Sequence, residues 1–223
     1  MGQFPYRRSR RLKTLSAGSP RTSPQHFKKA ISPRLQNKQI QLDSKEVLGV
    51  DIENGTRWGW GPNGYTYPQI YAVAWKWVGS PDEDVKCILL DWRQSNETLK
   101  DHCGELWDDL SRADKFLGHN FRHDWGGLQG LARDLELPFL KTRPLVDTFK
   151  DIPNHTGPSR SLEDLCQQFG LGPKPHLSQR DWTEAFIRWF PDKLEMVKNR
   201  NTQDVILTER LYLKEKELGW IDD

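Results

Sequence analysis

The sequence lacks long hydrophobic runs, and none of its apolar stretches approaches the roughly 18 residues that a membrane-spanning helix needs. Cysteine is also scarce: Cys87, Cys103 and Cys166 are odd in number, scattered, and include no C-x-x-C pair. This pattern argues against a disulfide framework and against a zinc site. We therefore expect no membrane association and a location in the reducing cytoplasm.

Acidic residues are nearly absent from the first 45 positions, which hold eleven Lys and Arg residues but only one acid, Asp43. Four prolines and the lack of apolar periodicity predict that residues 1–44 form a disordered basic arm. Three roles stay open for this arm: a solubilising tail, non-specific attraction to phosphates, or an organelle-targeting peptide. The rest of the chain is acidic, with 22 basic and 30 acidic residues.

The pattern of residues 45–223 is typical of one α/β domain. Three strands are predicted first, and their short connections favour an antiparallel meander. Amphipathic periodicity and capping residues predict helices further along, separated by two short strands. The predicted strands cover 46–54, 69–78, 85–92, 115–120 and 144–149, and a turn is predicted over 59–68. The predicted helices cover 95–113, 124–137, 159–171 and 193–217. Six tryptophans are expected in the core: Trp75, Trp77, Trp92, Trp107, Trp182 and Trp189.

Two carboxylates interrupt the first predicted strand, in the stretch EVLGVDIEN. Side chains alternate along a strand, so Asp51 and Glu53 project to the same side and lie close together. Burying two like charges without compensation is costly. Either basic side chains neutralise this pair, or the pair holds a cation.

Two further acids have ordinary explanations when each is taken alone. Asp124 follows a strand at the start of a helix, where a capping role explains it equally well. Asp204 lies in the final helix, which uses Val205, Leu207 and Leu211 for packing, and alone it indicates only a solvated face.

Taken together, these acids and their flanking residues resemble the 3′–5′ exonuclease superfamily known by its four acids, DEDD. The resemblance spans residues 46–221: DIE contains Asp51 and Glu53, GHNFRHD ends in Asp124, and NTQDVILTERLY contains Asp204. The last motif is similar to that of phage-encoded exonuclease-like proteins, which runs YNxQDVxLTExLY. The resemblance implies an RNase H-like fold with a mixed central sheet, a three-strand antiparallel meander plus parallel strands, flanked by helices.

The resemblance also implies the chemistry. Two divalent ions, Mg²⁺ or Mn²⁺, held about 3.5–4 Å apart by carboxylates would activate water and stabilise the transition state of phosphodiester hydrolysis. Asp51 would bridge both ions, Glu53 and Asp204 would complete one site, and Asp124 would hold the other through water. The expected substrate is the 3′ end of nucleic acid, single-stranded DNA above all, with Asn120 among the substrate-binding residues. Because no polymerase domain follows in the sequence, a separate DNA polymerase is an expected partner.

One part of the family pattern is missing. Members carry a Tyr four residues before the last Asp or a His five residues before it, and these positions are Arg200 and Asn199 here. Neither side chain acts as a general base near neutral pH. We expect Asn199 to position a water and Arg200 to contact a phosphate. Three histidines are further candidates for the role of the missing Tyr or His: His119, His123 and His176. Trp58 is a candidate for stacking on a base, although hairpin packing explains it as well.

Two alternatives follow from this departure and from the fold. The first is a catalytically impaired protein that keeps the exonuclease fold and binds nucleic acid or assists a polymerase. The second, less well supported by the GHN and QDV motifs, is an RNase H-like endonuclease.

Overall fold

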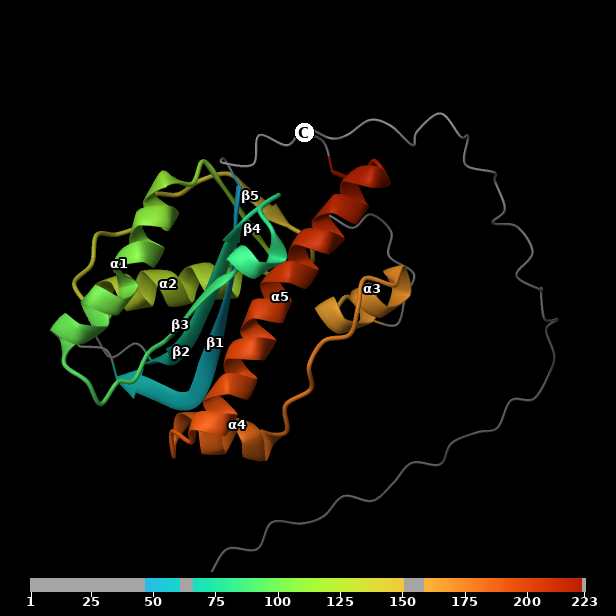
Figure 1. The fold of residues 1–223 in the computed structure, drawn as a ribbon. Coiled ribbons are helices and arrows are strands. Elements are labelled where there is room, and N and C mark those ends of the chain that lie inside the picture. Colours follow the sequence, from blue (N-terminus) through green and yellow to red (C-terminus); the bar gives the residue numbers. More distant parts are fainter. Residues whose placement is uncertain (1–46, 61–65, 151–158, 222–223) are drawn as a thin grey trace, which may run out of the picture. The chain divides into compact units, whose positions relative to one another are not determined.

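A five-stranded mixed sheet forms the centre of the chain (Figure 1). The computed structural model describes residues 47–60, 66–150 and 159–221, without the side chains of 55–60 and 66–68. The predicted basic arm lies outside the described residues, so its disorder and its boundary at residue 44 stay predictions. None of the described helices combines the length and the hydrophobicity needed to span a bilayer.

The sheet has the predicted mixed topology. Strands β1 (Val47–Trp60), β2 (Thr66–Trp77) and β3 (Lys86–Leu89) form the antiparallel meander. Strands β4 (Lys115–Gly118) and β5 (Leu145–Asp147) extend it with parallel pairs, which gives the order β3-β2-β1-β4-β5.

The hairpin between β1 and β2 is longer than predicted. The Gly- and Pro-rich composition of residues 59–68 indicated a turn, but β1 continues to Trp60, which pairs with Thr66. Pairing with a neighbouring strand outweighs weak local propensity. The register shifts directly after Glu53, and such an irregularity re-aims the side chains next to it.

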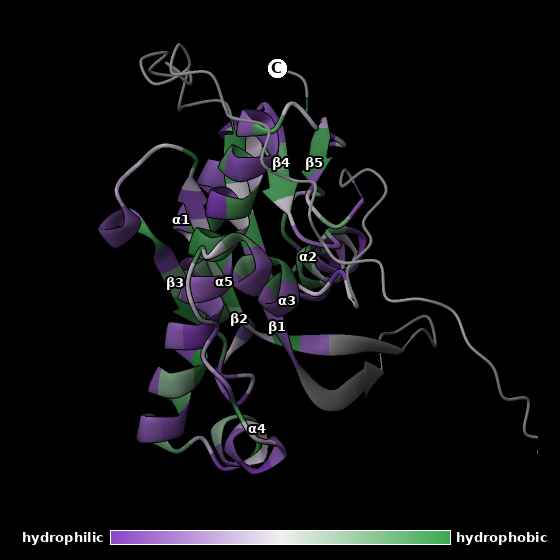
Figure 2. Ribbon diagram, turned by 90° about the vertical axis from the view of Figure 1, so that its right-hand side faces the viewer, coloured by the Kyte–Doolittle hydropathy of each residue, from purple (hydrophilic) through white to green (hydrophobic). Residues whose placement is uncertain are grey.

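Helices cover both faces of the sheet (Figure 1). Alternate residues of β1, Leu48, Val50 and Ile52, join the core formed with α1 (Asn96–Arg112) and α2 (Arg122–Asp134). The intervening positions face α5 (Pro191–Glu217), where a Cβ on Gly49 would lie 3.5 Å from Val205 Cγ1. Figure 2 shows strands β4 and β5 mainly in the colour of hydrophobic residues, whereas much of the helical ribbon has the colour of hydrophilic residues.

Serine caps start three of the helices. Ser95, Ser161 and Ser178 each accept a hydrogen bond from a backbone N–H in the first turn of α1, α3 (Leu162–Phe169) and α4 (Gln179–Phe186), respectively. Ser95 and Ser161 lie at or near the starts of the helices predicted over 95–113 and 159–171. Helix α4 was not predicted, although the reciprocal capping box of Ser178 and Asp181 is a sequence signal for it.

A buried ion pair fastens α5 to the sheet. The ammonium of Lys76, on β2, pairs with Glu209 of α5, and both side chains are buried. The other carboxylate oxygen of Glu209 accepts a hydrogen bond from Gly79 N–H at 2.6 Å. Because α5 carries Asp204, this pair helps to fix the helix that completes the acid cluster described next.

Candidate metal centre

Three carboxylates from two elements meet between β1 and α5. Strand alternation puts Asp51 and Glu53 on the face of β1 that α5 covers, and Asp204 approaches from α5. Their ligand oxygens lie within 4.8 Å of one another. Asp204 is only 2% exposed, so it is not the solvated acid that its helix alone would indicate. We call Asp51, Glu53, Asp204 and the neighbouring Asp124 the acid cluster.

Asp124 joins the cluster from the first turn of α2. Strand β4 pairs with β1 only as far as Gly49, so the backbone beyond it is open on that side. The N–H of Ile52 donates to Asp124 Oδ1 at 3.3 Å, and Asp124 is 5% exposed. Its charge also raises the pKa of Asp51, which places it within electrostatic reach of the other acids.

Burial raises the pKa of every acid in the cluster, and repulsion from other cluster acids adds to this for Asp51, Glu53 and Asp124. For Asp51, burial comes first and repulsion from Asp204, Asp124 and Glu53 follows, and together they raise the pKa well above its ordinary value. Burial raises the pKa of Glu53 to about 7 and that of Asp124 to about 8. Burial also raises the pKa of Asp204. The protein's own groups therefore leave negative charge here incompletely compensated.

Two basic side chains and one amide supply partial compensation. Lys174 Nζ lies 2.7 Å from Asp204 Oδ2, and Arg200 Nε lies 3.3 Å from Glu53 Oε1. Asn201 Nδ2 donates to Asp51 Oδ2 at 2.6 Å. The sequence had left open whether basic groups or a cation compensate the pair in β1. Basic groups are present, and Lys174 was the member that sequence reasoning missed, because the loop after α3 gives no periodic signal.

The acid cluster fits a divalent cation. All of its ligand atoms are carboxylate oxygens, the donors that Mg²⁺ and Mn²⁺ prefer. Asp204 Oδ1 is buried and has no hydrogen-bond partner among the described residues. A cation would satisfy this oxygen and relieve the repulsion among Asp51, Glu53 and Asp124.

The two candidates for the missing Tyr or His occupy different surroundings. Arg200 lies about one turn before Asp204 on the same side of α5, and its Nη1 also donates to Pro175 O at 2.7 Å. Asn199 is exposed, and helical geometry places it about 140° around the axis from Asp204. Arg200 therefore reaches the acid cluster directly in this structure, through Glu53.

The remaining candidates make contacts with residues outside the acid cluster. Asn120 has an exposed side chain and a left-handed backbone (φ 62°), and its N–H donates to Asp147 Oδ1 at 2.8 Å. His119 uses both ring nitrogens, one with Thr148 Oγ1 and one with Arg160 O, each at 2.9 Å.

His123 contacts Asn54, and His176 is exposed. The side chain of Trp58 lies outside the described residues. Among the tryptophans expected in the core, Trp75 and Trp107 are buried, whereas the other four are partly buried and pack against core clusters: Trp77, Trp92, Trp182 and Trp189.

No protein-family model and no curated protein sequence matches the chain. A solved structure does: the family B DNA polymerase from the hyperthermophilic archaeon Pyrobaculum calidifontis, with 17% identity and a TM-score of 0.57. The match covers 78% of this chain and 25% of that one. The fold is RNase H-like. The sheet order and the flanking helices described above agree with that prediction.

Two weaker structural likenesses accompany it. NrnC from Brucella melitensis is 14% identical, with a TM-score of 0.48 and coverage of 80% of this chain and 79% of that one. The catalytic unit of Pan2 from Neurospora crassa, described as its protease and nuclease domain, is 14% identical with a TM-score of 0.44, over 79% and 28% of the two chains. The fold assignment depends on neither of them.

Proposed function

We propose that this chain is a metal-dependent 3′–5′ exonuclease that acts on single-stranded DNA. One observation carries the proposal: four acids from β1, α2 and α5, far apart in the sequence, gather at one place where burial raises the pKa of each. Like charges gather in this way only where basic groups, bound protons or a cation compensate them, and the basic groups here compensate only in part. The shared fold with part of a DNA polymerase supports a nucleic-acid substrate.

In this proposal Asp51, Glu53 and Asp204 hold one divalent ion, and Asp51 and Asp124 share in holding a second. Mg²⁺ or Mn²⁺ bound there supplies an activated water and stabilises charge on the scissile phosphate. Asn201 orients Asp51 by donating to its Oδ2. Arg200 and Lys174 place positive charge at the cluster, where their N–H groups would serve as donors to a phosphate oxygen if a cation held the carboxylates.

The finer assignments belong to the proposal as well. Asn120 contacts the substrate and Trp58 stacks on a base, whereas a water-positioning role for Asn199 stays a prediction from the sequence, because Asn199 lies about 140° around α5 from Asp204. A separate DNA polymerase is the proposed partner, and a cytoplasmic location and a likeness to phage-encoded proteins stay predictions from the sequence.

Labelled strands test the proposal. The full chain is incubated with 3′- and 5′-labelled single strands of DNA and RNA, with Mg²⁺, Mn²⁺ or EDTA. We expect stepwise loss of nucleotides from the 3′ end of DNA, abolished by EDTA and by Asp51→Asn or Asp204→Asn. Asp101→Asn, at an exposed position on α1, is the matched control and should retain full activity. Undiminished cleavage by a folded Asp51→Asn variant would refute the assignment.

A second candidate function is a binding protein with impaired turnover. It is favoured by the two ion pairs, Lys174 with Asp204 and Arg200 with Glu53, which place basic groups on two of the proposed metal ligands. This candidate predicts metal and strand binding without products from either labelled end. Internal cuts in place of stepwise products would favour an RNase H-like endonuclease.

A further inference from the structure

A second surface starts at the acid cluster and continues over α4. Residues 179–190, which we call the α4 platform, combine arginine with aromatic side chains in a short segment. Its members are Arg180, Trp182, Phe186, Arg188, Trp189 and Phe190. Ile187 and Phe190 are 48% and 41% exposed, and Trp182 and Trp189 are partly exposed. Basic and aromatic residues interleaved on an exposed surface are typical of proteins that bind single-stranded nucleic acid.

Hollows connect the platform to the acid cluster. The first has a volume of about 180 Å³ and is lined by Glu53, Asn54, Gln179, Trp182 and Phe186. Glu53 therefore belongs both to the acid cluster and to the wall of this hollow. The Oδ1 atom of Asn54 is buried and lacks a hydrogen-bond partner among the described residues, so this wall has an unused polar atom.

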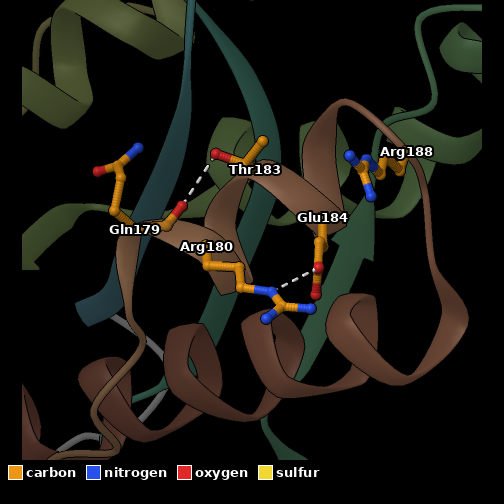
Figure 3. Close-up of a pocket in the computed structure, with 5 residues that line it drawn as sticks. All are labelled: Gln179, Arg180, Thr183, Glu184 and Arg188. Carbon is orange, nitrogen blue, oxygen red and sulfur yellow. Dashed lines mark hydrogen bonds and ion pairs between the residues drawn. The ribbon is translucent and has the colours of Figure 1, made fainter.

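Two further hollows each have one lining residue in common with the first. One of about 320 Å³ shares Gln179 with it and is lined by Arg180, Thr183, Glu184 and Arg188 (Figure 3). Another, of about 220 Å³, shares Phe186 and includes Arg93 and Trp189. The hollow beside Glu53 therefore has a lining residue in common with a hollow beside Arg180 and Arg188 and with one beside Arg93 and Trp189.

The arginines of this surface stack on aromatic rings. The guanidinium of Arg200 lies 5.6 Å from the Trp182 ring, and that of Arg93 lies 5.2 Å from Trp189. Such stacking leaves the edge of a guanidinium to hydrogen-bond acceptors, which here are Glu53 and Pro175 O for Arg200 and Asp91 for Arg93. Arg188 lies 5.9 Å from the ring of its neighbour Phe190.

The charges on the platform are unevenly compensated. Arg180 pairs with Glu184 at 2.8 Å, the contact drawn in Figure 3, and Arg93 pairs with Asp91. No ion pair is recorded for Arg188 within the part of the chain that the structure describes. Trp189 has a left-handed backbone (φ 57°), which is costly for a tryptophan and is sustained here by hydrogen bonds of the flanking turn.

We propose that the α4 platform binds the single strand that adjoins the end held at the acid cluster. Bases stack on Trp182 and Trp189, and the arginines contact phosphates without sequence preference. The location of the strand's end rests on the proposed nuclease function, whereas binding rests on the platform's own chemistry.

Charge variants give the first test. Binding of the full chain to 5′-fluorescein-labelled 15-nucleotide oligo-dT and oligo-rU is measured by anisotropy in EDTA, at several salt concentrations. Arg180→Gln/Arg188→Gln should weaken binding and reduce the slope of log K against log salt by about 1.4, at about 0.7 per phosphate contact on a single strand. Arg112→Gln/Arg143→Gln is the control: it has the same net charge, and Arg112, like Arg180, is an exposed arginine paired with a buried acid.

Aromatic variants give the second test. Trp182→Ala should weaken binding between about fivefold and about 150-fold, whereas Trp182→Phe keeps an aromatic face and should lose much less. Phe139→Ala removes an aromatic side chain that is 68% exposed and lies outside the platform, and should have no effect. The Phe variant separates lost stacking from any loosening of α4.

The outcomes separate this proposal from the nuclease proposal. Strand binding that depends on the platform, without any cleavage, supports the platform and contradicts the nuclease. Cleavage with equal affinities and equal salt slopes in the platform and control variants overturns the platform alone. Failure of the unmodified chain to bind either oligonucleotide also overturns it.

Discussion

Replacing Asp124 by Asn should make the metal-free protein less sensitive to alkaline pH. Burial raises the pKa of Asp124 from 3.8 to about 8 in the folded state. Between these values the folded protein holds a proton that the unfolded chain has released. Unfolding therefore releases a proton, and the free energy of unfolding falls as the pH rises through this window.

The magnitude follows from the width of the window. About 4 pH units at 1.36 kcal/mol each give on the order of 6 kcal/mol as an upper limit. Asp51 and Glu53 titrate together with Asp124 and keep their own burial, so the substitution relieves only part of this. We expect Asp124→Asn to be more stable than the unmodified protein by about 2–3 kcal/mol at pH 9, with little difference at pH 5. The amide oxygen can still accept the N–H of Ile52.

Urea denaturation in EDTA at pH 5, 7 and 9 measures this directly. Asp101→Asn, an exposed acid of α1, is the control and should follow the profile of the unmodified protein. Millimolar Mn²⁺ at pH 8 should stabilise the unmodified protein more than Asp124→Asn, because a ligand that binds only the folded state stabilises it. Parallel pH profiles for Asp124→Asn and the unmodified protein would refute the account of the acid cluster.

Three further predictions concern the surroundings of the cluster. Lys174→Met removes the ammonium that competes for the Asp204 carboxylate and should tighten Mn²⁺ binding in calorimetry, whereas Lys141→Met, at an exposed position, should not. Equal Mn²⁺ affinities of Lys174→Met and the unmodified protein would exclude competition. Gly118→Ala would put a Cβ 2.4 Å from the ring of Phe121, in the turn before α2, and should lower the free energy of unfolding, measured with urea, by about 1–3 kcal/mol. Gly104→Ala has open space around it and should leave the stability unchanged or raise it. Lys76→Met leaves its buried glutamate partner unpaired and should cost about 3–5 kcal/mol; a loss under 1 kcal/mol would contradict burial of the pair.

Local patterns in the sequence were sufficient for most of the fold. Strand alternation placed Asp51 and Glu53 on one face, and amphipathic periodicity with capping residues predicted helices over 95–113 and 159–171, where α1 and α3 lie. Apolar periodicity located α5 to within two residues of its observed start at Pro191. These features depend on neighbours along the chain, which is why they can be predicted from it. The predicted turn over 59–68 was too long, because pairing between two strands, here of Trp60 with Thr66, does not follow from the composition of the segment itself.

The order of the four acids indicated which of them meet, but their environment was decided by tertiary structure. Only packing of α5 against β1 buries Asp204, and only the end of β4 pairing at Gly49 leaves Ile52 N–H for Asp124. Lys174 reaches the cluster from an irregular loop, and Trp182 borders it from a helix that was not predicted. The sequence by itself determined the elements and the types of ligand. Burial, charge compensation and the hollow beside Glu53 depend on contacts between separate segments of the chain, such as Arg200 with Glu53, 147 residues apart, and these form only in the folded chain.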